Sequence, residues 1–207
     1  MENHNHIIIS LGRQVGSGGL TLARMLAEDL GCKLYDRELL YLAAKESGFS
    51  ETIFEKNDEQ KGFFKTLTHL HVPFVSDSNF FHNDISDENL YRLQSEVIQK
   101  AADEGSCVFV GRTADYVLRN RKDMLRLFIT SPLDVRVKRV AERQSISENA
   151  AAKYIKEKEE DRASYYNYYT GKEWGAAESY DLCIDSSILG LEGTEKFIAS
   201  FVREKFK

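Results

Sequence analysis

The sequence predicts an α/β protein with a mainly parallel sheet, because short apolar runs alternate with segments of helical periodicity. The first apolar run leads directly into a glycine-rich loop and an amphipathic helix, and helix-start signals recur between the later runs. The 207 residues, 42% hydrophobic and 29% charged, suffice for one domain with a sizeable core. We therefore expect a single domain built from β-α-β units.

The first elements are the most clearly marked. Residues 7–11, Ile-Ile-Ile-Ser-Leu, are typical of a fully buried strand. A helix is predicted over residues 20–30, where Leu22 and Leu26 lie four residues apart, and Gly31 suits its C-terminal cap. The same patterns predict further strands and a helix near residues 87–102. The strands are expected at residues 33–35, 107–110, 125–130 and 180–184.

Serine marks two helix starts in the second half of the chain. Ser131 precedes a proline and has an acid three residues on, Asp134, so it is predicted to cap a helix. The S-x-x-E pattern from Ser145 to Glu148 predicts another helix, which runs to about Tyr165.

The charge distribution bounds the class of ligand. The net charge is −5, which argues against a nucleic-acid binder. The acidity belongs to the first half, whereas residues 112–143 hold nine basic and four acidic side chains. This local excess predicts a small anionic ligand.

Cysteine usage and hydropathy indicate the compartment. Cys32, Cys107 and Cys183 stand far apart beside apolar segments, so buried, reduced thiols are expected. The five histidines have no partner cysteines, which argues against a zinc site. No apolar run approaches the roughly 20 residues of a membrane span, and the first residues lack signal-peptide features. We expect a soluble cytoplasmic protein without a membrane partner.

The most informative segment is the loop from Gly12 to Thr21, Gly-Arg-Gln-Val-Gly-Ser-Gly-Gly-Leu-Thr, between the first strand and the first helix. Glycines permit positive φ, and successive N–H groups with a helix N-terminus form a cradle for phosphate. The alternative is a tight turn whose glycines serve packing alone. The candidate phosphate-binding residues are Gly16, Ser17, Gly18, Gly19, Leu20 and Thr21.

This loop departs from the P-loop pattern G-x-x-x-x-G-K-[ST]. With Gly18 as the second glycine, Arg13 takes the place of the first glycine and Gly19 that of the lysine. Leu20 replaces the hydroxyl residue, so Thr21 is the nearest hydroxyl and the candidate for Mg²⁺. Another cation must replace the lysine if phosphoryl transfer occurs; Arg13 is a local candidate, and the basic patch at residues 112–143 is a distal one.

Further arginines follow the later strands. Arg136, Arg139 and Arg143 share one face of the helix predicted after Ser131, and Arg162 ends the next helix. They are interpreted as phosphate clamps, the alternative being a solvated face paired with neighbouring acids.

Two strand ends carry candidate acceptor residues, because ligands of open α/β sheets bind at the carboxyl ends of strands. Arg112 follows the strand at residues 107–110, and its alternative role is that of a surface arginine beside Asp115. Asp36 and Arg37 follow the strand at residues 33–35, where Asp36 could instead cap a helix.

Six of the 10 tyrosines lie between Tyr154 and Tyr180. Tyr165, Tyr168 and Tyr169 share a face if the helix continues, so we expect them to pack against the core. Base stacking by one of them is the alternative.

Together, these segments resemble the cytidylate kinase-like branch of the nucleoside monophosphate kinases. The resemblance rests on residues 10–19, 34–39, 108–116 and 162–175, with Tyr180-Asp-Leu182, and spans nearly the whole chain. It implies a three-layer P-loop NTPase fold with a five-stranded parallel sheet, a nucleoside monophosphate (NMP)-binding helical insertion and a lid. The core then covers about residues 6–35 and 105–207, the insertion about 36–104 and the lid about 143–175. Residues 50–86, rich in phenylalanine and histidine, are read as an inserted helical or mobile subdomain.

The resemblance implies an enzyme that uses ATP and Mg²⁺ to phosphorylate a nucleoside monophosphate, CMP or dCMP above others. Cytidylate kinases carry Gly-Arg-Asp after the third strand, whereas Thr113 stands in place of that acid here. The alternatives are a P-loop kinase of another small phosphate acceptor and a nucleotide-binding regulator. The expected catalytic residues are Arg13, Arg139, Arg143 and Arg162. The expected acceptor-binding residues are Asp36, Arg37, Arg112 and Asp115.

Overall fold

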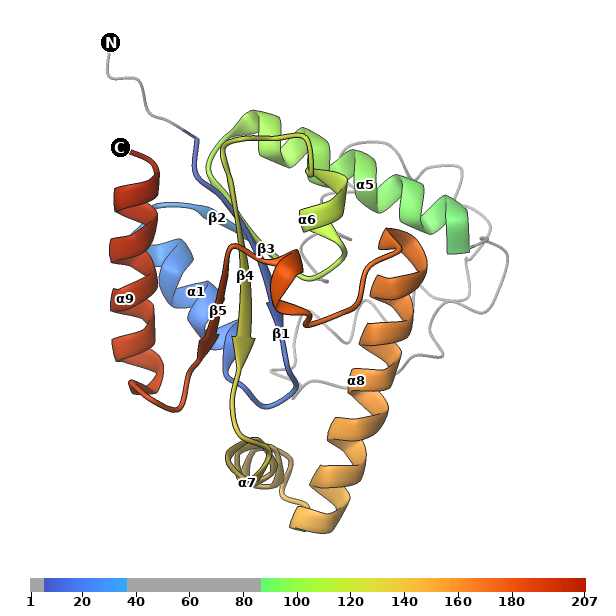
Figure 1. Ribbon diagram of the computed structural model, residues 1–207. Helices are drawn as coiled ribbons and strands as arrows, with labels where there is room; N and C mark the ends of the chain where they lie inside the picture. Colours follow the sequence, from blue (N-terminus) through green and yellow to red (C-terminus); the bar gives the residue numbers. More distant parts are fainter. Residues whose placement is uncertain (1–5, 37–86) are drawn as a thin grey trace, which may run out of the picture.

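The computed structural model describes residues 6–36 and 87–207 and contains a parallel sheet of five strands (Figure 1). The order across the sheet is β2-β3-β1-β4-β5, and every pairing is parallel. This architecture confirms the predicted α/β class. The strands are β1 (Ile8–Arg13), β2 (Lys33–Tyr35), β3 (Cys107–Val110), β4 (Met124–Thr130) and β5 (Leu182–Asp185).

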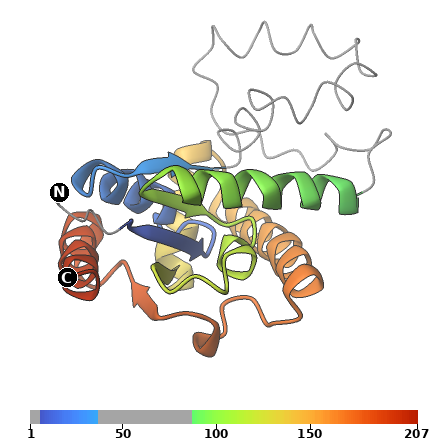
Figure 2. The same ribbon diagram turned by 90° about the horizontal axis from the view of Figure 1, so that it is seen from above.

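Alternation along the central strand β1 divides the core into two halves. Ile9 and Leu11 are buried in the cluster that α1 (Gly19–Asp29) and α9 (Gly190–Lys205) cover. Ile8 belongs to the opposite cluster, which α5 (Asp87–Glu104) and α6 (Ala114–Val117) cover. The sheet therefore lies between two helical layers, as the view from above shows (Figure 2).

The first helix follows its sequence pattern closely. Its apolar stripe, with Leu22 and Leu26, is fully buried against the sheet. Gly31 has φ +63° just beyond the helix and donates its N–H to the Glu28 carbonyl. The predicted glycine cap is thus confirmed.

Two helices extend the molecule beyond the carboxyl edge of the sheet. Helices α7 (Leu133–Gln144) and α8 (Glu148–Thr170) pack on each other through Val140, Ala151 and Ile155, together with Val15 of the glycine loop. Helix α8 continues past the expected end near Tyr165, and a short 3-10 helix, Ala177–Ser179, leads into β5. The prediction for residues 50–86 lies outside the described residues.

The serine caps differ from the predictions. Pro132 occupies the N-cap position of α7, and the buried Ser131 hydroxyl has no hydrogen-bond partner among the described residues. Ser145 ends α7 with φ +55°, so it cannot start α8. Ser147 is the N-cap of α8 and accepts a hydrogen bond from the Ala150 N–H at 3.3 Å. Three residues, Ser145, Ile146 and Ser147, connect the two helices, so the N-cap of α8 is Ser147 and not Ser145.

The three cysteines are free thiols, as predicted, but they differ in burial. Cys107 is fully buried in β3, and burial raises its pKa to about 12. Cys32 is half-buried, and burial raises its pKa to about 11. Cys183 is exposed, contrary to expectation, because β5 is an edge strand.

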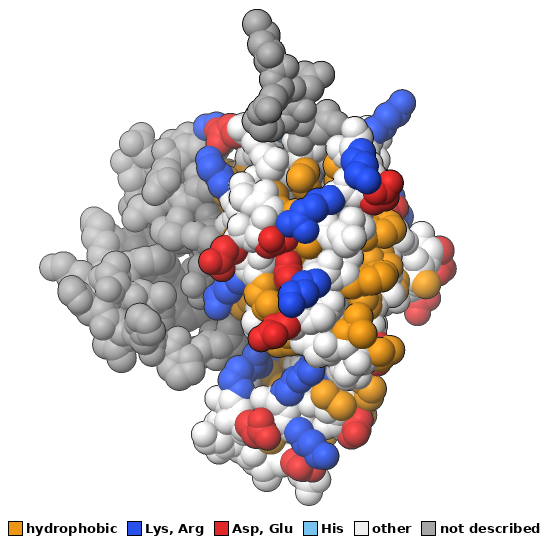
Figure 3. All heavy atoms as spheres, turned by 90° about the vertical axis from the view of Figure 1, so that its left-hand side faces the viewer, with side chains coloured by type: hydrophobic (Ala, Val, Ile, Leu, Met, Phe, Trp, Pro, Cys, Tyr) orange, Lys and Arg blue, Asp and Glu red, His pale blue; other side chains and the backbone are white. Residues whose placement is uncertain are grey.

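Among the described residues, no helix is long and apolar enough to cross a membrane. Apolar side chains do reach the surface on the face that α9 occupies (Figure 3). Ile188 and Leu189 lie just before α9, and Phe197 and Phe201 lie on it.

Candidate phosphate-binding site

The glycine loop is shaped to present backbone N–H groups. Gly16 and Gly18 have φ of +83° and +81°, which glycine adopts without strain. Gly18 is the N-cap of α1, and no side chain caps this helix. The first i−4 bond is donated by the Leu22 N–H to the Gly18 carbonyl at 3.0 Å. The preceding N–H groups, those of Gly19, Leu20 and Thr21, therefore lack an intrahelical acceptor at the positive end of the helix.

Side chains from distant elements fix the outer side of the loop. Glu159 of α8 accepts the Val15 N–H at 3.0 Å and an Arg136 N–H at 2.8 Å. Arg136, which is 6% exposed, also donates to the carbonyls of Val15 and Ser131. Arg136 is thus a structural brace, not the phosphate clamp that its helical face suggested. Glu159 was missed by the sequence analysis, since 144 residues separate it from its loop partner.

Arg139 also contacts the loop backbone. Its Nη1 lies 3.4 Å from the Gly16 carbonyl oxygen and 3.3 Å from the Ser186 hydroxyl. Ser186, which follows β5, donates to the Ser17 carbonyl at 2.6 Å. The Ser17 hydroxyl is buried and donates to the Gln14 carbonyl at 2.9 Å. Ser17 and Arg139 therefore hold the loop in shape.

Arg13 is the last residue of β1 and directly precedes the loop. Its carbonyl oxygen accepts a hydrogen bond from Arg162 Nη1 at 3.0 Å. Burial, followed by the charges of Arg162 and Arg112, lowers the pKa of Arg13 well below its usual value, while Asp36 acts in the opposite direction. Such a concentration of guanidinium groups is stabilised when an anion binds between them.

Arg162 shares this environment. Burial is the main cause that lowers its pKa, and the charges of Arg112 and Arg143 add to the effect, while Glu159 opposes it. Arg143 is exposed in the last turn of α7. The structure thus brings Arg13, Arg112 and Arg162 into one electrostatically coupled group, with Arg143 at its margin.

Arg112 is held in a strained backbone. Gly111, Arg112 and Thr113 follow β3 with φ of +74°, +57° and +53° in succession. Arg112 and Thr113 are adjacent non-glycine residues in the left-handed region, where the Cβ atom crowds the backbone and lowers the stability of the fold. The Arg112 guanidinium carbon lies 5.7 Å from the centroid of the Tyr165 ring. Asp36 follows β2 at the same edge of the sheet, and Arg37 lies outside the described residues.

Asp115 has a role that the sequence analysis did not foresee. Its side chain is buried, and the Tyr166 hydroxyl donates to its Oδ2 at 2.7 Å. Burial raises the pKa of Asp115, although the hydrogen bond from Tyr166 opposes this effect. The carboxyl group joins α6 to α8 in the interior.

The tyrosines of α8 divide between core, contact and surface. Tyr166 is buried, whereas Tyr168 is 72% exposed, so the expectation that Tyr168 packs against the core is wrong. Tyr169 stacks on Tyr91 of α5 with ring centroids 3.9 Å apart and planes 1° from parallel. Tyr165 meets Tyr91 edge-on at 6.5 Å. These three rings join α8 to α5, close to Arg112.

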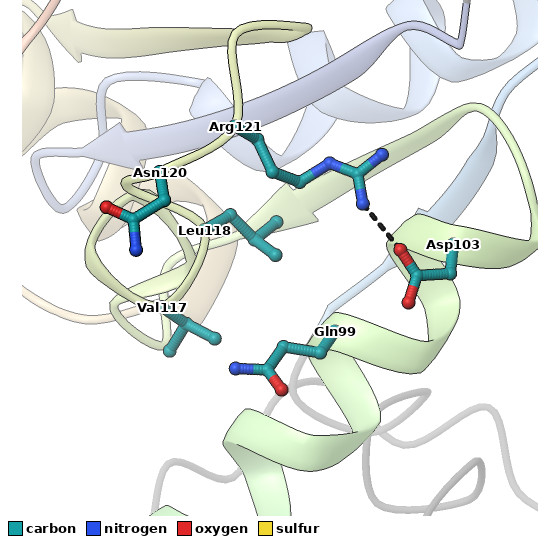
Figure 4. A pocket seen from close by; sticks show the side chains of 6 residues that line it. All are labelled: Gln99, Asp103, Val117, Leu118, Asn120 and Arg121. Atoms are coloured by element: carbon teal, nitrogen blue, oxygen red, sulfur yellow. Dashed lines mark hydrogen bonds and ion pairs between the residues drawn. The ribbon is translucent and has the colours of Figure 1, made fainter.

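A separate hollow of about 240 Å³ lies between α5, α6 and the segment before β4 (Figure 4). Arg121 spans its edge and pairs with Asp103 at 2.5 Å and Asp123 at 2.8 Å. Asp103, Arg121 and Asp123 lie close to the amino-terminal ends of β3 and β4. The hollow is therefore at the amino-terminal end of the sheet, whereas the glycine loop is at the carboxyl end.

The metal ligands on the loop side are few. No group of three His, Cys, Asp or Glu side chains in residues 6–36 and 87–207 is arranged to hold a metal ion. Leu20 packs partly against the core, and Thr21 is exposed in the first turn of α1. A Mg²⁺ ion on a nucleotide takes most of its ligands from phosphate and water and needs few from the protein, and Thr21 offers an exposed hydroxyl in the first turn of α1.

The fold, this loop and the family match reported below together define a protein of the P-loop kinase class. The fold matches that of a crystallised protein from Eubacterium ventriosum with a TM-score of 0.72 at 27% identity, covering 95% of this chain and 98% of that one. Shikimate kinase from Bacteroides thetaiotaomicron shares the fold with a TM-score of 0.53 at 15% identity, over 95% of this chain and 98% of that one.

The chain belongs to the cytidylate kinase-like family, whose pattern it matches over residues 8–188. The cytidylate kinase of Pyrococcus horikoshii is 32% identical over 189 residues, which cover 90% of this chain and 83% of that protein. The family predicted from the residue motifs is therefore confirmed.

Proposed function

We propose that this protein transfers a phosphoryl group from ATP to a nucleoside monophosphate, with CMP or dCMP as the preferred acceptor. Membership of the cytidylate kinase-like family supports the nucleoside monophosphate kinase role. The observation that carries the proposal is the convergence of the N–H cradle at Gly16–Thr21 with the arginine group of Arg13, Arg112 and Arg162. This arrangement suits a ligand with several adjacent phosphates.

In the proposed reaction, the bond between the γ-phosphorus of ATP and its β-phosphate oxygen breaks. A phosphate oxygen of the monophosphate forms a new bond to that phosphorus, giving ADP and the nucleoside diphosphate. Negative charge moves onto the β-phosphate of ADP, and the transferring oxygens pass between the two nucleotides. The protein contributes alignment and charge stabilisation, which dominate phosphoryl transfer.

Each group of residues has a proposed part in this step. The N–H groups of the cradle hold the donor β-phosphate, and Arg13, Arg143 and Arg162 neutralise the transferring group. Arg139 acts by holding the Gly16 carbonyl, and thereby the loop. Arg112, Asp36 and Arg37 bind the acceptor at the ends of β3 and β2. Asp115 is left out of this group, because its carboxyl group is buried against Tyr166.

Mg²⁺ would be held by the Thr21 hydroxyl together with the nucleotide phosphates, and it would supply charge neutralisation there. The segment around α8 is proposed as the lid, because it carries Arg162 and lies beyond the carboxyl edge of the sheet. The proposed acceptor domain is the insertion at about residues 36–104, of which the structure describes Asp36 and α5.

The choice of base depends on residues other than Thr113. The Thr113 side chain is 2% exposed, and its hydroxyl lies 2.6 Å from the Arg112 carbonyl and 3.4 Å from the Tyr91 hydroxyl. It is thus engaged within the protein and does not replace the acid of cytidylate kinases as a reader of cytosine. The CMP preference rests on the names of the relatives, among them that of Pyrococcus horikoshii.

A coupled assay of ADP formation with every ribo- and deoxyribonucleoside monophosphate tests the proposal. We expect the highest kcat/KM with CMP or dCMP, and a loss of about 100-fold in Arg162→Gln. The matched control is Arg119→Gln, since Arg119 is exposed and lies over the Tyr116 ring of α6. No ADP above the ATPase background with any acceptor would refute the kinase activity. A rise in melting temperature with ATP under those conditions would instead favour a nucleotide-binding regulator.

A further inference from the structure

The two departures from the P-loop pattern touch each other in the structure. A Cβ atom added to Gly19 would lie 2.6 Å from the Cβ atom of Arg13 and 2.9 Å from its Cγ atom. Both distances are shorter than real Cβ contacts. Arg13 stands where the pattern has its first glycine, and Gly19 stands where it has lysine. The arginine in the place of the first glycine and the glycine in the place of the lysine are therefore neighbours in space.

Space, not backbone conformation, explains the glycine at position 19. Gly19 is the first residue of α1 and does not have a positive φ, so other residues could adopt its backbone conformation. The Arg13 stem lies closest to the missing side chain, and a Leu11 methyl group follows at 3.4 Å. A lysine at this position would have to displace Arg13.

A second glycine borders the far end of the Arg13 side chain. A Cβ atom on Gly111 would lie 2.5 Å from Arg13 Nη1. The side chain thus begins over Gly19, at the start of α1, and ends at Gly111, directly after β3. This path carries the guanidinium from the loop of β1 toward the neighbouring strand, where Arg112 follows.

We propose that Arg13 and Gly19 form a reciprocal exchange, in which Arg13 supplies the cation that lysine supplies in the usual loop and Gly19 clears its path. Gly111 clears the far end of the same path. A planar guanidinium can bind two oxygens of a phosphate at once, and its fixed stem holds it in place. Arg13 is then a catalytic residue and Gly19 a positioning residue. This inference rests on the proposed phosphoryl transfer.

The test is a double-mutant cycle with Arg13→Gly, Gly19→Ala and the combined variant. We expect Arg13→Gly to lower kcat/KM by about 100-fold. Gly19→Ala should lower it too, because the added methyl group displaces the guanidinium. In the Arg13→Gly background, Gly19→Ala should have almost no further effect, since no stem remains to be displaced. If Gly19→Ala lowers kcat/KM by the same factor in the parent and in the Arg13→Gly background, the exchange is overturned.

Rescue provides the stronger result. Moving the cation back, in Arg13→Gly/Gly19→Lys, should recover at least 10-fold in kcat/KM over Arg13→Gly, whereas Gly19→Lys alone should lose activity. The matched control is Gly105→Ala, because nothing lies within 4 Å of a Cβ atom there and Gly105 has no positive φ. It should keep the activity of the parent. No recovery in the double variant contradicts the role of Arg13.

Binding of inorganic pyrophosphate, measured by calorimetry, separates this inference from the proposed function. Gly19→Ala should raise the Kd for pyrophosphate in the parent but not in the Arg13→Gly background. This result is expected even if no nucleoside monophosphate is phosphorylated. Melting temperatures identify a purely structural effect. If Gly19→Ala lowers the melting temperature of the parent and of Arg13→Gly by the same amount, the added methyl group does not clash with Arg13. That outcome would also overturn the exchange.

Discussion

At the scale of single residues, the strained turn after β3 links stability to function. Arg112 adopts φ +57°, which for a residue with a Cβ atom costs about 1 kcal/mol. We expect Arg112→Gly to stabilise the protein by about this amount, because glycine adopts the conformation without strain. The same variant should lose acceptor affinity. Urea unfolding and the KM for the acceptor measure the two effects.

The control for this prediction is Arg112→Ala, which removes the guanidinium but keeps the Cβ atom. It should lose the same affinity without the gain in stability. Equal stability of the glycine and alanine variants would show that the positive φ carries no strain.

Asp115 leads to a prediction about pH. Its pKa is raised in the folded protein, mainly by burial, so the folded state binds its proton more tightly than the unfolded state. The associated stability is present below the unfolded value of about 3.9 and is lost as the pH rises through the folded value. We expect Asp115→Asn to be more stable than the parent at pH 7, with a difference that shrinks near pH 4.

Melting curves between pH 4 and pH 8 measure this dependence. Asp115→Ala is the comparison, because it leaves the Tyr166 hydroxyl without its acceptor and should destabilise the protein. A parent that is more stable than Asp115→Asn across the whole range would contradict the prediction.

Residue partners were the least predictable part of the site. The loop and Arg13 could be identified from sequence, because glycine spacing and position after a strand are local signals. Glu159 and Ser186 could not, since each contacts the loop across more than 140 residues. Arg136 was predicted to bind phosphate for the same reason. Its position on the helix face was correct, but no sequence pattern indicated that it pairs with Glu159 of α8.

At the scale of elements, the junction between α7 and α8 depends on one serine. Ser147 caps α8 through the Ala150 N–H, and removing such a cap costs about 1 kcal/mol. We expect Ser147→Ala to lower the free energy of unfolding by this amount. Ser131→Ala is the control, since the buried Ser131 hydroxyl has no hydrogen-bond partner in the described part of the chain. A larger loss in Ser131→Ala would reverse the assignment of the caps.

Element types were predicted well, and their ends less so. Strands β2 and β3 begin and end as predicted; β3 is a fully buried apolar run of four residues, whereas β2 is a three-residue strand whose Lys33 is exposed. The caps were misplaced because Ser131, Ser145 and Ser147 all suit an N-cap by sequence. The packing of α7 on α8 sets the length of their connection, and only that length selects Ser147.

At the scale of the whole molecule, the coupled arginines predict stabilisation by anions. Inorganic pyrophosphate at 100 times its Kd should raise stability by about 2.7 kcal/mol. For a chain of this size, such a gain raises Tm by about 5–10 °C. The shift should shrink at high salt, because screening weakens the attraction.

Thermal unfolding at low and high sodium chloride tests this expectation. Arg162→Gln should show a smaller shift than the parent, whereas Arg119→Gln should show the parent shift. An undiminished shift in Arg162→Gln would place the anion elsewhere on the molecule.

The overall architecture followed from the sequence to a large extent. The alternation of apolar runs and helices predicted a parallel sheet, and β1 with its loop predicted where an anion would bind. The order β2-β3-β1-β4-β5 depends on long-range pairing, which no local pattern encodes. Most of the predicted insertion, at residues 37–86, lies outside the described residues.

The packing of Trp174 gives the protein an intrinsic optical reporter. It is the single tryptophan of the chain and lies between α8 and the short helix before β5. Its ring meets Phe128 of β4 edge-on at 5.3 Å, and its backbone N–H donates to Asn167 of α8. Its emission therefore reports whether the segment after α8 is seated on the sheet. Fluorescence of the unlabelled protein can follow that segment in real time as nucleotide is added.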